Sequence, residues 1–263
     1  MNRLSIASAF FVLISPLCHA VDFEPGFQSR EMAARQYTTS DAVGELGGVP
    51  VTIPKHFASY LEYDNDPDWG KRRTGPTPPR THASRIRSFG FDVRYPDMQG
   101  LSSPSLVEDQ KSYTIFNTPW IGVSVISGDF YSGDGFLDRI LYQDTEGARK
   151  RASSTIYEQQ KEKYAGLTIF HIIGVDENTG TPNREYRNAR DLFVAYHKGT
   201  MRAKAVIYCS NRNIPSAGCK HMFSLDNGQK AEVTVRYRRE DLQKWNSIQE
   251  SVSKLILGFK VKQ

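Results

Sequence analysis

Alternating hydrophobic and polar residues predict several strands of antiparallel sheet in this chain. In FGFDVRYPDM (89–98), Phe89, Phe91, Val93 and Tyr95 alternate with polar or small residues, which is the period of a half-buried strand. TPWIGVSVISG (118–128) and GLTIFHIIGV (166–175) are apolar at both phases and predict buried strands. VPVTI (49–53) and FASYLEY (57–63) have the β-branched and aromatic composition of strands.

Two hairpins are predicted in the second half of the chain. Residues 190–210 carry a turn at Lys198-Gly199, and residues 220–238 carry a DNG turn, which is a strong hairpin signal. In the last of these strands Val233, Val235 and Tyr237 alternate with polar residues. One face of that strand therefore packs and the other meets water.

The C-terminal segment has the apolar spacing of a helix that lies on a sheet. Glu240 and Asp241 stand at its start, where the helix dipole favours negative charge, and Gly258 can end it. An earlier helix is predicted within residues 132–144, with Asp134 as its N-cap. The apolar stripe of the C-terminal helix consists of Leu242, Trp245, Ile248, Val252, Leu255, Ile256 and Phe259.

This order of elements predicts an α+β protein with antiparallel sheets and helices packed on one face. Each half runs through strands and then a helix, so two similar sandwiches or one continuous sheet would both fit. The expected units are a signal peptide (1–20), a polar lead-in (21–47), an N-terminal α+β half (48–145), a charged, helix-compatible linker (146–165) and a C-terminal α+β half (166–263).

The N-terminus has the layout of a cleaved secretory signal. Arg3 precedes an apolar run over residues 4–17, and Ala20 occupies the position of a signal peptidase site. We therefore expect an exported, periplasmic protein cut after Ala20, with no stable insertion in the membrane. A lipid anchor on Cys18 is the alternative, although Leu17 stands where lipoprotein signals carry a small residue.

Cys209 and Cys219 are the cysteines that would remain after this cleavage. Export favours a disulfide between them, and it would close a turn-rich segment between two predicted strands. Zinc would need four ligands, and only His221 lies nearby. Free structural thiols and a reactive thiol are the other interpretations, and the last would need a neighbouring base.

The sequence contains no arrangement typical of catalysis. It has no Ser-nucleophile elbow, no H-E-x-x-H and no Gly-rich phosphate loop, and its histidines are scattered singly. We expect no enzyme activity, no cofactor and no metal. The formal net charge of +5 is only mildly basic and, with export, argues against a nucleic-acid partner.

Residues 64–88 form a long charged loop, which we expect to contact a protein partner. DNDPDWG has the acidic spacing of a calcium loop, but Trp69 and Gly75 stand where the EF-hand needs glycine and glutamate. Prolines lower the ordering cost of the basic part, which would suit an acidic protein surface or phosphate head groups. A solvated loop is the competing interpretation. The predicted contact residues are Asp64, Asp66, Asp68, Trp69, Lys71, Arg72, Arg73 and Arg80.

The stretches VTIPKHFASYLEYDNDPDWG (51–70), RTHASRIRSFGFDVRYPDMQGLSSP (80–104) and GDFYSGDGFLDR (128–139) resemble a known group of proteins. They are similar to the periplasmic immunity proteins encoded beside lipase effectors of type VI secretion systems, over roughly residues 46–140. The resemblance implies a non-enzymatic protein without cofactor that binds and sterically neutralises a cognate secreted lipase. An exported hydrolase with an unrecognised site and a periplasmic adaptor of an envelope machine are the alternatives.

Overall fold

A computed structural model describes residues 40–68, 71–151, 155–225 and 228–262. The predicted signal peptide and Cys18 lie outside these residues. The strands are β1 (Ala42–Leu46), β2 (Val49–Ile53), β3 (Ser59–Tyr63), β4 (Ile86–Arg94), β5 (Gln99–Gly100), β6 (Trp120–Ile126), β7 (Ile156–Tyr164), β8 (Leu167–Ile173), β9 (Arg190–Tyr196), β10 (Ala203–Ser210), β11 (Gly218–Ser224) and β12 (Glu232–Arg238). The helices are α1 (Pro104–Ser112), α2 (Phe136–Asp144), α3 (Glu146–Lys150) and α4 (Trp245–Leu257), with 3-10 turns η1 (Lys55–Phe57), η2 (Gly128–Phe130), η3 (Asn183–Glu185) and η4 (Arg239–Lys244).

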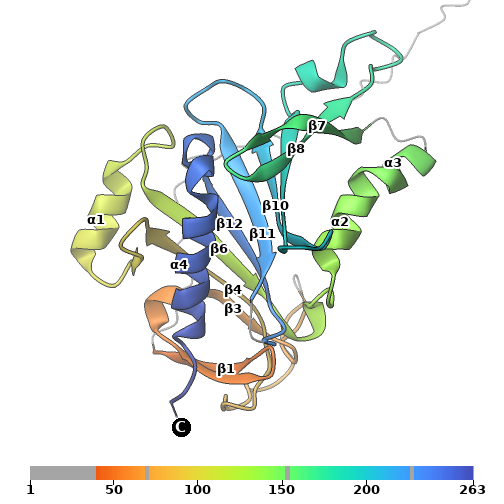
Figure 1. Cartoon of the computed structure of the whole chain (residues 1–263). Coiled ribbons are helices and arrows are strands. Elements are labelled where there is room, and N and C mark those ends of the chain that lie inside the picture. The colour runs from red at the N-terminus through yellow and green to blue at the C-terminus, as the bar shows by residue number, and fades with distance from the viewer. Residues whose placement is uncertain (1–39, 69–70, 152–154, 226–227, 263) are drawn as a thin grey trace, which may run out of the picture.

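One continuous sheet runs through both halves of the chain (Figure 1). Its order is β3-β4-β6-β12-β11-β10-β9-β8-β7, with β5 paired to β4, and every pair is antiparallel. The halves meet where β6 pairs with β12, with Val123 opposite Val235. The α+β class is therefore confirmed in its continuous-sheet form, while the proposed unit boundaries stay a prediction.

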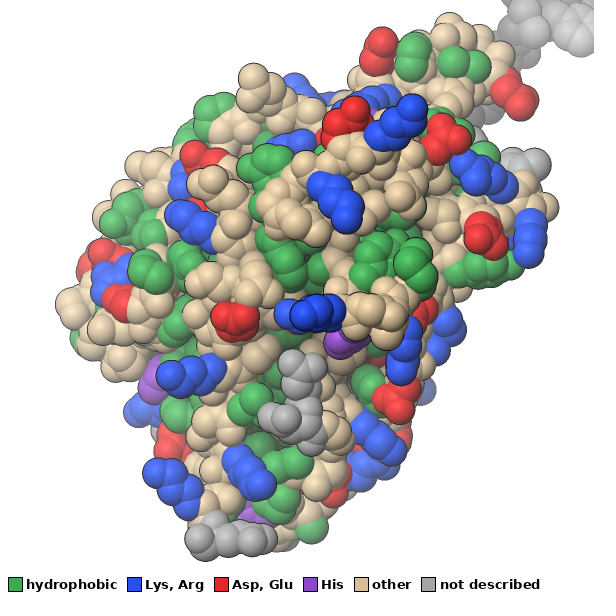
Figure 2. All heavy atoms as spheres, in the orientation of Figure 1, with side chains coloured by type: hydrophobic (Ala, Val, Ile, Leu, Met, Phe, Trp, Pro, Cys, Tyr) green, Lys and Arg blue, Asp and Glu red, His purple; other side chains and the backbone are tan. Residues whose placement is uncertain are grey.

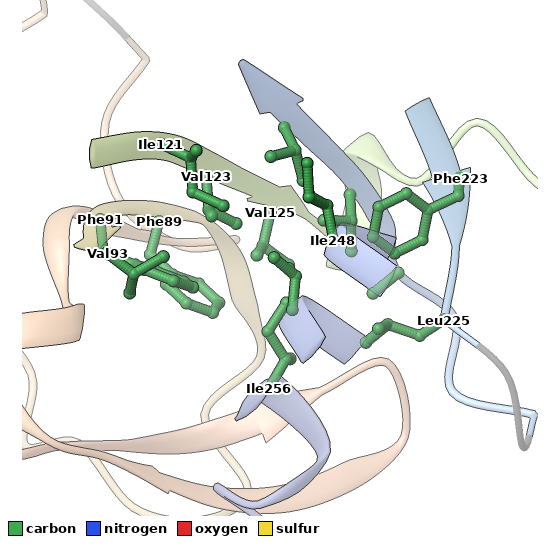
Figure 3. Packing of buried hydrophobic residues seen from close by; sticks show 14 of the residues in the cluster. Phe89, Phe91, Val93, Ile121, Val123, Val125, Phe223, Leu225, Ile248 and Ile256 are labelled. Atoms are coloured by element: carbon green, nitrogen blue, oxygen red, sulfur yellow. The ribbon is translucent and has the colours of Figure 1, made fainter. Parts of the chain in front are cut away.

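The main core lies between the sheet and α4, which crosses in front of β12 and β6 in Figure 1. Ile248, Val252 and Ile256 are fully buried, as the apolar stripe predicts. They pack against the alternate residues of the strands, such as Val125 and Phe223 (Figure 3). The apolar residues of the helix recur with the helical period and those of the strands with the strand period. Both sets therefore face each other in one core.

A second core lies on the opposite face of the sheet. There Phe136 and Leu137 of α2 pack against Val206 and Met222. The expectation that the helices share one face is therefore incomplete. The reason is that β9 and β10 are apolar at both phases, so each face of these strands needs its own cover.

Residues 156–164 form strand β7, although their charge pattern predicted a linker or helix. Ala165 and Gly166, both with positive φ, make the tight turn back into β8. β7 is the last strand of the sheet and most of its side chains are exposed. An edge strand tolerates charged residues, which also discourage pairing with another chain.

The polar lead-in and residues 101–119 hold elements that the hydrophobic pattern did not predict. Residues 42–46 form β1, which turns at Gly47-Gly48 into β2. A Cβ on Gly47 would approach the Lys230 backbone nitrogen to 2.5 Å. Helix α1 buries no residue, and its signal was local: Ser103 caps the Leu106 backbone nitrogen, with Pro104 at the first helical position.

Asp134 is not the N-cap of α2, so that expectation is wrong. The capping position is Gly135, whose φ of 73° lies in the left-handed region. The Asp134 carboxylate instead accepts a hydrogen bond from the Tyr131 hydroxyl at 2.7 Å. Glycine is needed there because the chain turns sharply from η2 into the helix.

His221 is a fully buried base at the centre of the α4 face. Its ring nitrogens lie 3.2 Å from Gln249 Oε1 and 3.4 Å from the Tyr237 hydroxyl. Burial lowers the pKa of His221 to about 3, although the Gln249 hydrogen bond opposes this shift. The ring is therefore neutral in the folded protein at neutral pH.

We expect this histidine to make the fold acid-sensitive. The unfolded chain gains a proton near pH 6.5 and the folded chain does not, so stability is lost as pH falls from 6.5 towards 3. Between about pH 7 and pH 5 the free energy of unfolding should fall by roughly 2 kcal/mol. Urea titrations of the wild type and His221→Gln at both pH values measure it. Other histidines contribute equally to both proteins, so an identical pH dependence would contradict the assignment.

Candidate functional site

The acids of the predicted contact loop bind arginines of the same loop. Asp66 forms short ion pairs with Arg73 and Arg80, and it also accepts a hydrogen bond from the Tyr63 backbone nitrogen at 2.8 Å. Arg80 lies over the Tyr63 ring at 4.1 Å. These contacts hold the Asp66 carboxylate and both guanidinium groups within the loop, so these residues are only partly available to a partner.

Asp64 also has a structural role. Its carboxylate lies 3.2 Å from Arg85 and accepts a hydrogen bond from the Asp129 backbone nitrogen at 3.0 Å. Arg87, which is buried, donates to the Asp64 carbonyl at 2.6 Å. The loop is thereby fastened to β4 and η2, and the calcium interpretation loses its ligands to arginine. Among the described residues no group of three or more potential ligands could hold a metal ion.

Three of the predicted contact residues, Asp68, Lys71 and Arg72, are exposed. Asp68 and Lys71 pair with each other at 2.8 Å on the surface. Arg72 is exposed, and no salt bridge joins it to a carboxylate in the part of the chain that the structure describes. Trp69 lies outside the described residues. A role of the loop in partner binding stays a prediction, with Asp68, Lys71 and Arg72 as its accessible members among the described residues.

The structure contains a larger candidate site on the α4 face, which we call the β8–β9 cleft. It has a volume of about 740 Å³. Ile169, His171, Asp191 and Phe193 form its floor on β8 and β9. The loop of residues 211–217 and the start of η4 form its walls. On this face of the molecule basic and acidic side chains are otherwise interspersed (Figure 2).

A buried carboxylate organises the charges of the cleft. The Asp191 side chain is 4% exposed and lies 2.9 Å from Arg239 and 3.1 Å from Arg184. Arg239 also donates to the Ser210 carbonyl. The two guanidinium groups exceed the single carboxylate in charge, so the cleft favours an anionic group from a ligand.

The rim of the cleft is apolar and exposed. Phe116, Tyr164 and Ile214 are each more than a third exposed. Arg212 stands beside Ile214 at the surface. Exposed aromatic and aliphatic side chains beside arginines are typical of the centre of protein–protein interfaces.

A disulfide holds the wall of this cleft. Cys209 and Cys219 are bonded and lie directly opposite each other on β10 and β11, as predicted. Asp191 is the partner of Cys209 on the next strand. The bridge closes residues 211–217, whose side chains line the cleft. On the loop-entropy estimate it stabilises the fold by roughly 2–3 kcal/mol, and it limits the motion of the wall.

The floor of the cleft places a histidine beside the buried carboxylate. His171 Nε2 lies 3.7 Å from Asp191, but the lining residues include no serine, threonine or cysteine that this pair could activate. Burial, and then the Arg184 guanidinium, lower the pKa of the His171 ring. The His171 side chain is only partly buried.

A second cavity, of about 500 Å³, lies between α2 and the turn before β12. Its polar side chains serve the fold: Asp138 accepts a hydrogen bond from the Ala203 backbone nitrogen at 2.7 Å, and Asp134 holds Tyr131. It offers fewer exposed apolar groups than the β8–β9 cleft.

The sequence pattern did not predict the β8–β9 cleft, because its residues come from segments far apart in the chain. One signal was available. Ile214 is an apolar residue inside the otherwise turn-rich segment SNRNIPSAG (210–218), and it becomes informative only when the fold places it beside Phe116 and Tyr164 in one exposed apolar patch.

The comparisons with known proteins establish the fold. No protein-family model matches the chain, and no curated protein sequence matches it. The structure is similar to that of an immunity protein of the Stenotrophomonas maltophilia type IV secretion system, with a TM-score of 0.54 and 19% sequence identity. The match covers 90% of this chain and 100% of the other. The α+β sheet is thus one that a solved structure shares. Among the described helices, none combines the length and apolar character needed to cross a membrane.

Proposed function

We propose that this protein is a periplasmic immunity protein that neutralises a cognate toxin by binding it. The observation that carries the proposal is the likeness, over the whole length of the other chain, to an immunity protein of a type IV secretion system. The disulfide supports an exported protein.

The toxin that we propose is a lipase effector of a type VI secretion system. This part rests on the sequence resemblance over roughly residues 46–140, because the structural neighbour serves a type IV system. The proposed mechanism is steric. The rigid sheet presents the β8–β9 cleft to a protruding element of the toxin. When the cleft binds this element, it blocks the mouth of the toxin's active site or holds the toxin's lid closed.

The test is inhibition of a purified lipase effector from the producing organism. Effectors that co-purify with the tagged, oxidised protein would be assayed on phospholipid vesicles with increasing amounts of it. We expect a stoichiometric end point. Failure to inhibit any secreted effector, or hydrolysis of the lipid by this protein alone, would overturn the proposed function.

Matched variants decide which surface binds the toxin. Arg212 and Ile214 are exposed on the cleft wall. Among the described residues, no carboxylate forms an ion pair with Arg212. Arg212→Glu with Ile214→Asp should weaken inhibition roughly 30-fold or more if the cleft is the centre of the interface. Lys71→Glu with Arg72→Glu tests the loop predicted from sequence. Loss of inhibition only in the loop variant would assign the interface to the loop.

A further inference from the structure

A cationic strip lies on the face of the sheet opposite α4. One cross-strand row runs from Asp92 through Gly122, Arg236 and Lys220 to Tyr208. Lys220 and Arg236 are therefore direct partners on adjacent strands. Arg190, further along β9 on the same face, is close enough to Lys220 to act on its charge.

This arrangement costs the fold stability. Like charges directly opposite each other on neighbouring strands repel. Partial burial, and then Arg236 and Arg190, lower the pKa of Lys220, which agrees with a crowded cationic site. Within the described residues, no salt bridge pairs any of these cations with a carboxylate. A bound anion would remove the repulsion that the fold leaves in place.

Helices border the strip on both sides. Gln110 of α1 donates to Asp92 at 2.6 Å, and Tyr208 donates to Asp144 of α2 at 2.5 Å. Four strand spacings separate β4 from β10, which is roughly 19 Å. A helix is about 10–12 Å wide, so roughly 8 Å remains between α1 and α2. Gly122 adds no side chain to this floor.

We propose that the Lys220–Arg236 pair of the strip, with Arg190 on β9 adding to its positive charge, binds an acidic, extended segment of a protein partner. The remaining width accommodates one extended chain, whose alternate carboxylates would meet the cations. A lipid bilayer is flat and would rest on the flanking helices, away from Lys220. The strip and the β8–β9 cleft lie on opposite faces of the sheet, so this inference does not depend on toxin neutralisation.

The experiment measures the fluorescence anisotropy of labelled hexaglutamate with the whole protein. We expect binding that weakens with salt, and about tenfold weaker binding by Lys220→Gln with Arg236→Gln. The control Lys254→Gln with Lys260→Gln changes the net charge equally, at exposed positions away from the strip, and should change affinity less than twofold. The strip variant should also melt at the same or a higher temperature, because repulsion has been removed.

Several results would overturn the inference. One is the absence of binding by the wild type, and another is an equal loss in the strip and control variants, which would indicate non-specific attraction. Preference for phosphatidylglycerol vesicles over hexaglutamate, lost in the strip variant, would assign the surface to a membrane instead. Should the double variant not fold, Arg236→Gln alone tests the same point, because Arg236 is exposed.

Discussion

Substitution of Ile248 by alanine is expected to lower the free energy of unfolding by about 3–4 kcal/mol. Ile248 is fully buried and lies in the contact between α4 and the sheet (Figure 3). Removing a buried isoleucine side chain loses its transfer free energy and leaves a cavity. Strands on one side and the helix backbone on the other restrict collapse around it. Urea denaturation monitored by tryptophan fluorescence measures the change.

Two substitutions on the same helix calibrate this result. Leu255 is partly buried against the same core, so Leu255→Ala should cost less than Ile248→Ala. Lys254 is exposed, and Lys254→Ala should change stability by less than about 0.5 kcal/mol. Equal effects at all three positions would show that helix propensity, and not burial on the sheet, determines the contribution of α4.

Much of this fold can be predicted from the spacing of hydrophobic residues along the sequence. The apolar stripe of α4 and the alternation in β4 and β12 are strong, and the structure buries the residues they indicate. β7 could not be predicted in this way, because residues 156–164 are charged and pair at the sheet edge through their backbone. The second core could not be predicted either. A strand that is apolar at both phases is expected to be buried on both faces, but its sequence does not identify the elements that cover each face.

The candidate site was less predictable than the fold. The disulfide followed from export and from the flanking strands. The charged loop had the composition of a contact surface, but Asp64 and Asp66 use its arginines internally. Ion pairs between residues so far apart in the loop depend on its folded path. The β8–β9 cleft needs the register of β8, β9 and β10, which no local pattern supplies.

The disulfide and the carboxylate of Asp191 act on the same wall of the cleft. Cys209 and Asp191 are direct partners on neighbouring strands, and Arg239 joins Asp191 to the Ser210 carbonyl at the end of β10. The bridge constrains the path of the loop, and the ion pairs hold its base against η4. Loss of either should therefore affect the shape of the cleft as well as stability.

We expect Asp191→Ala to lower the free energy of unfolding by about 2–3 kcal/mol. Breaking a buried ion pair leaves charges without compensation, which typically costs 3–5 kcal/mol. The lower value applies here because Arg184 and Arg239 are 42% and 31% exposed and can turn towards water. Asp191→Asn keeps the size and one acceptor, so it should cost less. Chemical denaturation of both variants at neutral pH gives the comparison.

A double-mutant cycle shows whether the cost arises from the arginine that is left behind. If Asp191 mainly compensates Arg239, then Asp191→Ala with Arg239→Ala should be less destabilised than the sum of the single variants, by about 1–2 kcal/mol. Arg184 remains in every variant and acts as a constant background. Strict additivity would mean that Asp191 stabilises the fold through its other neighbours, His171 and Arg184. The base of the cleft wall would then be held from the η3 side of the cleft and not from η4.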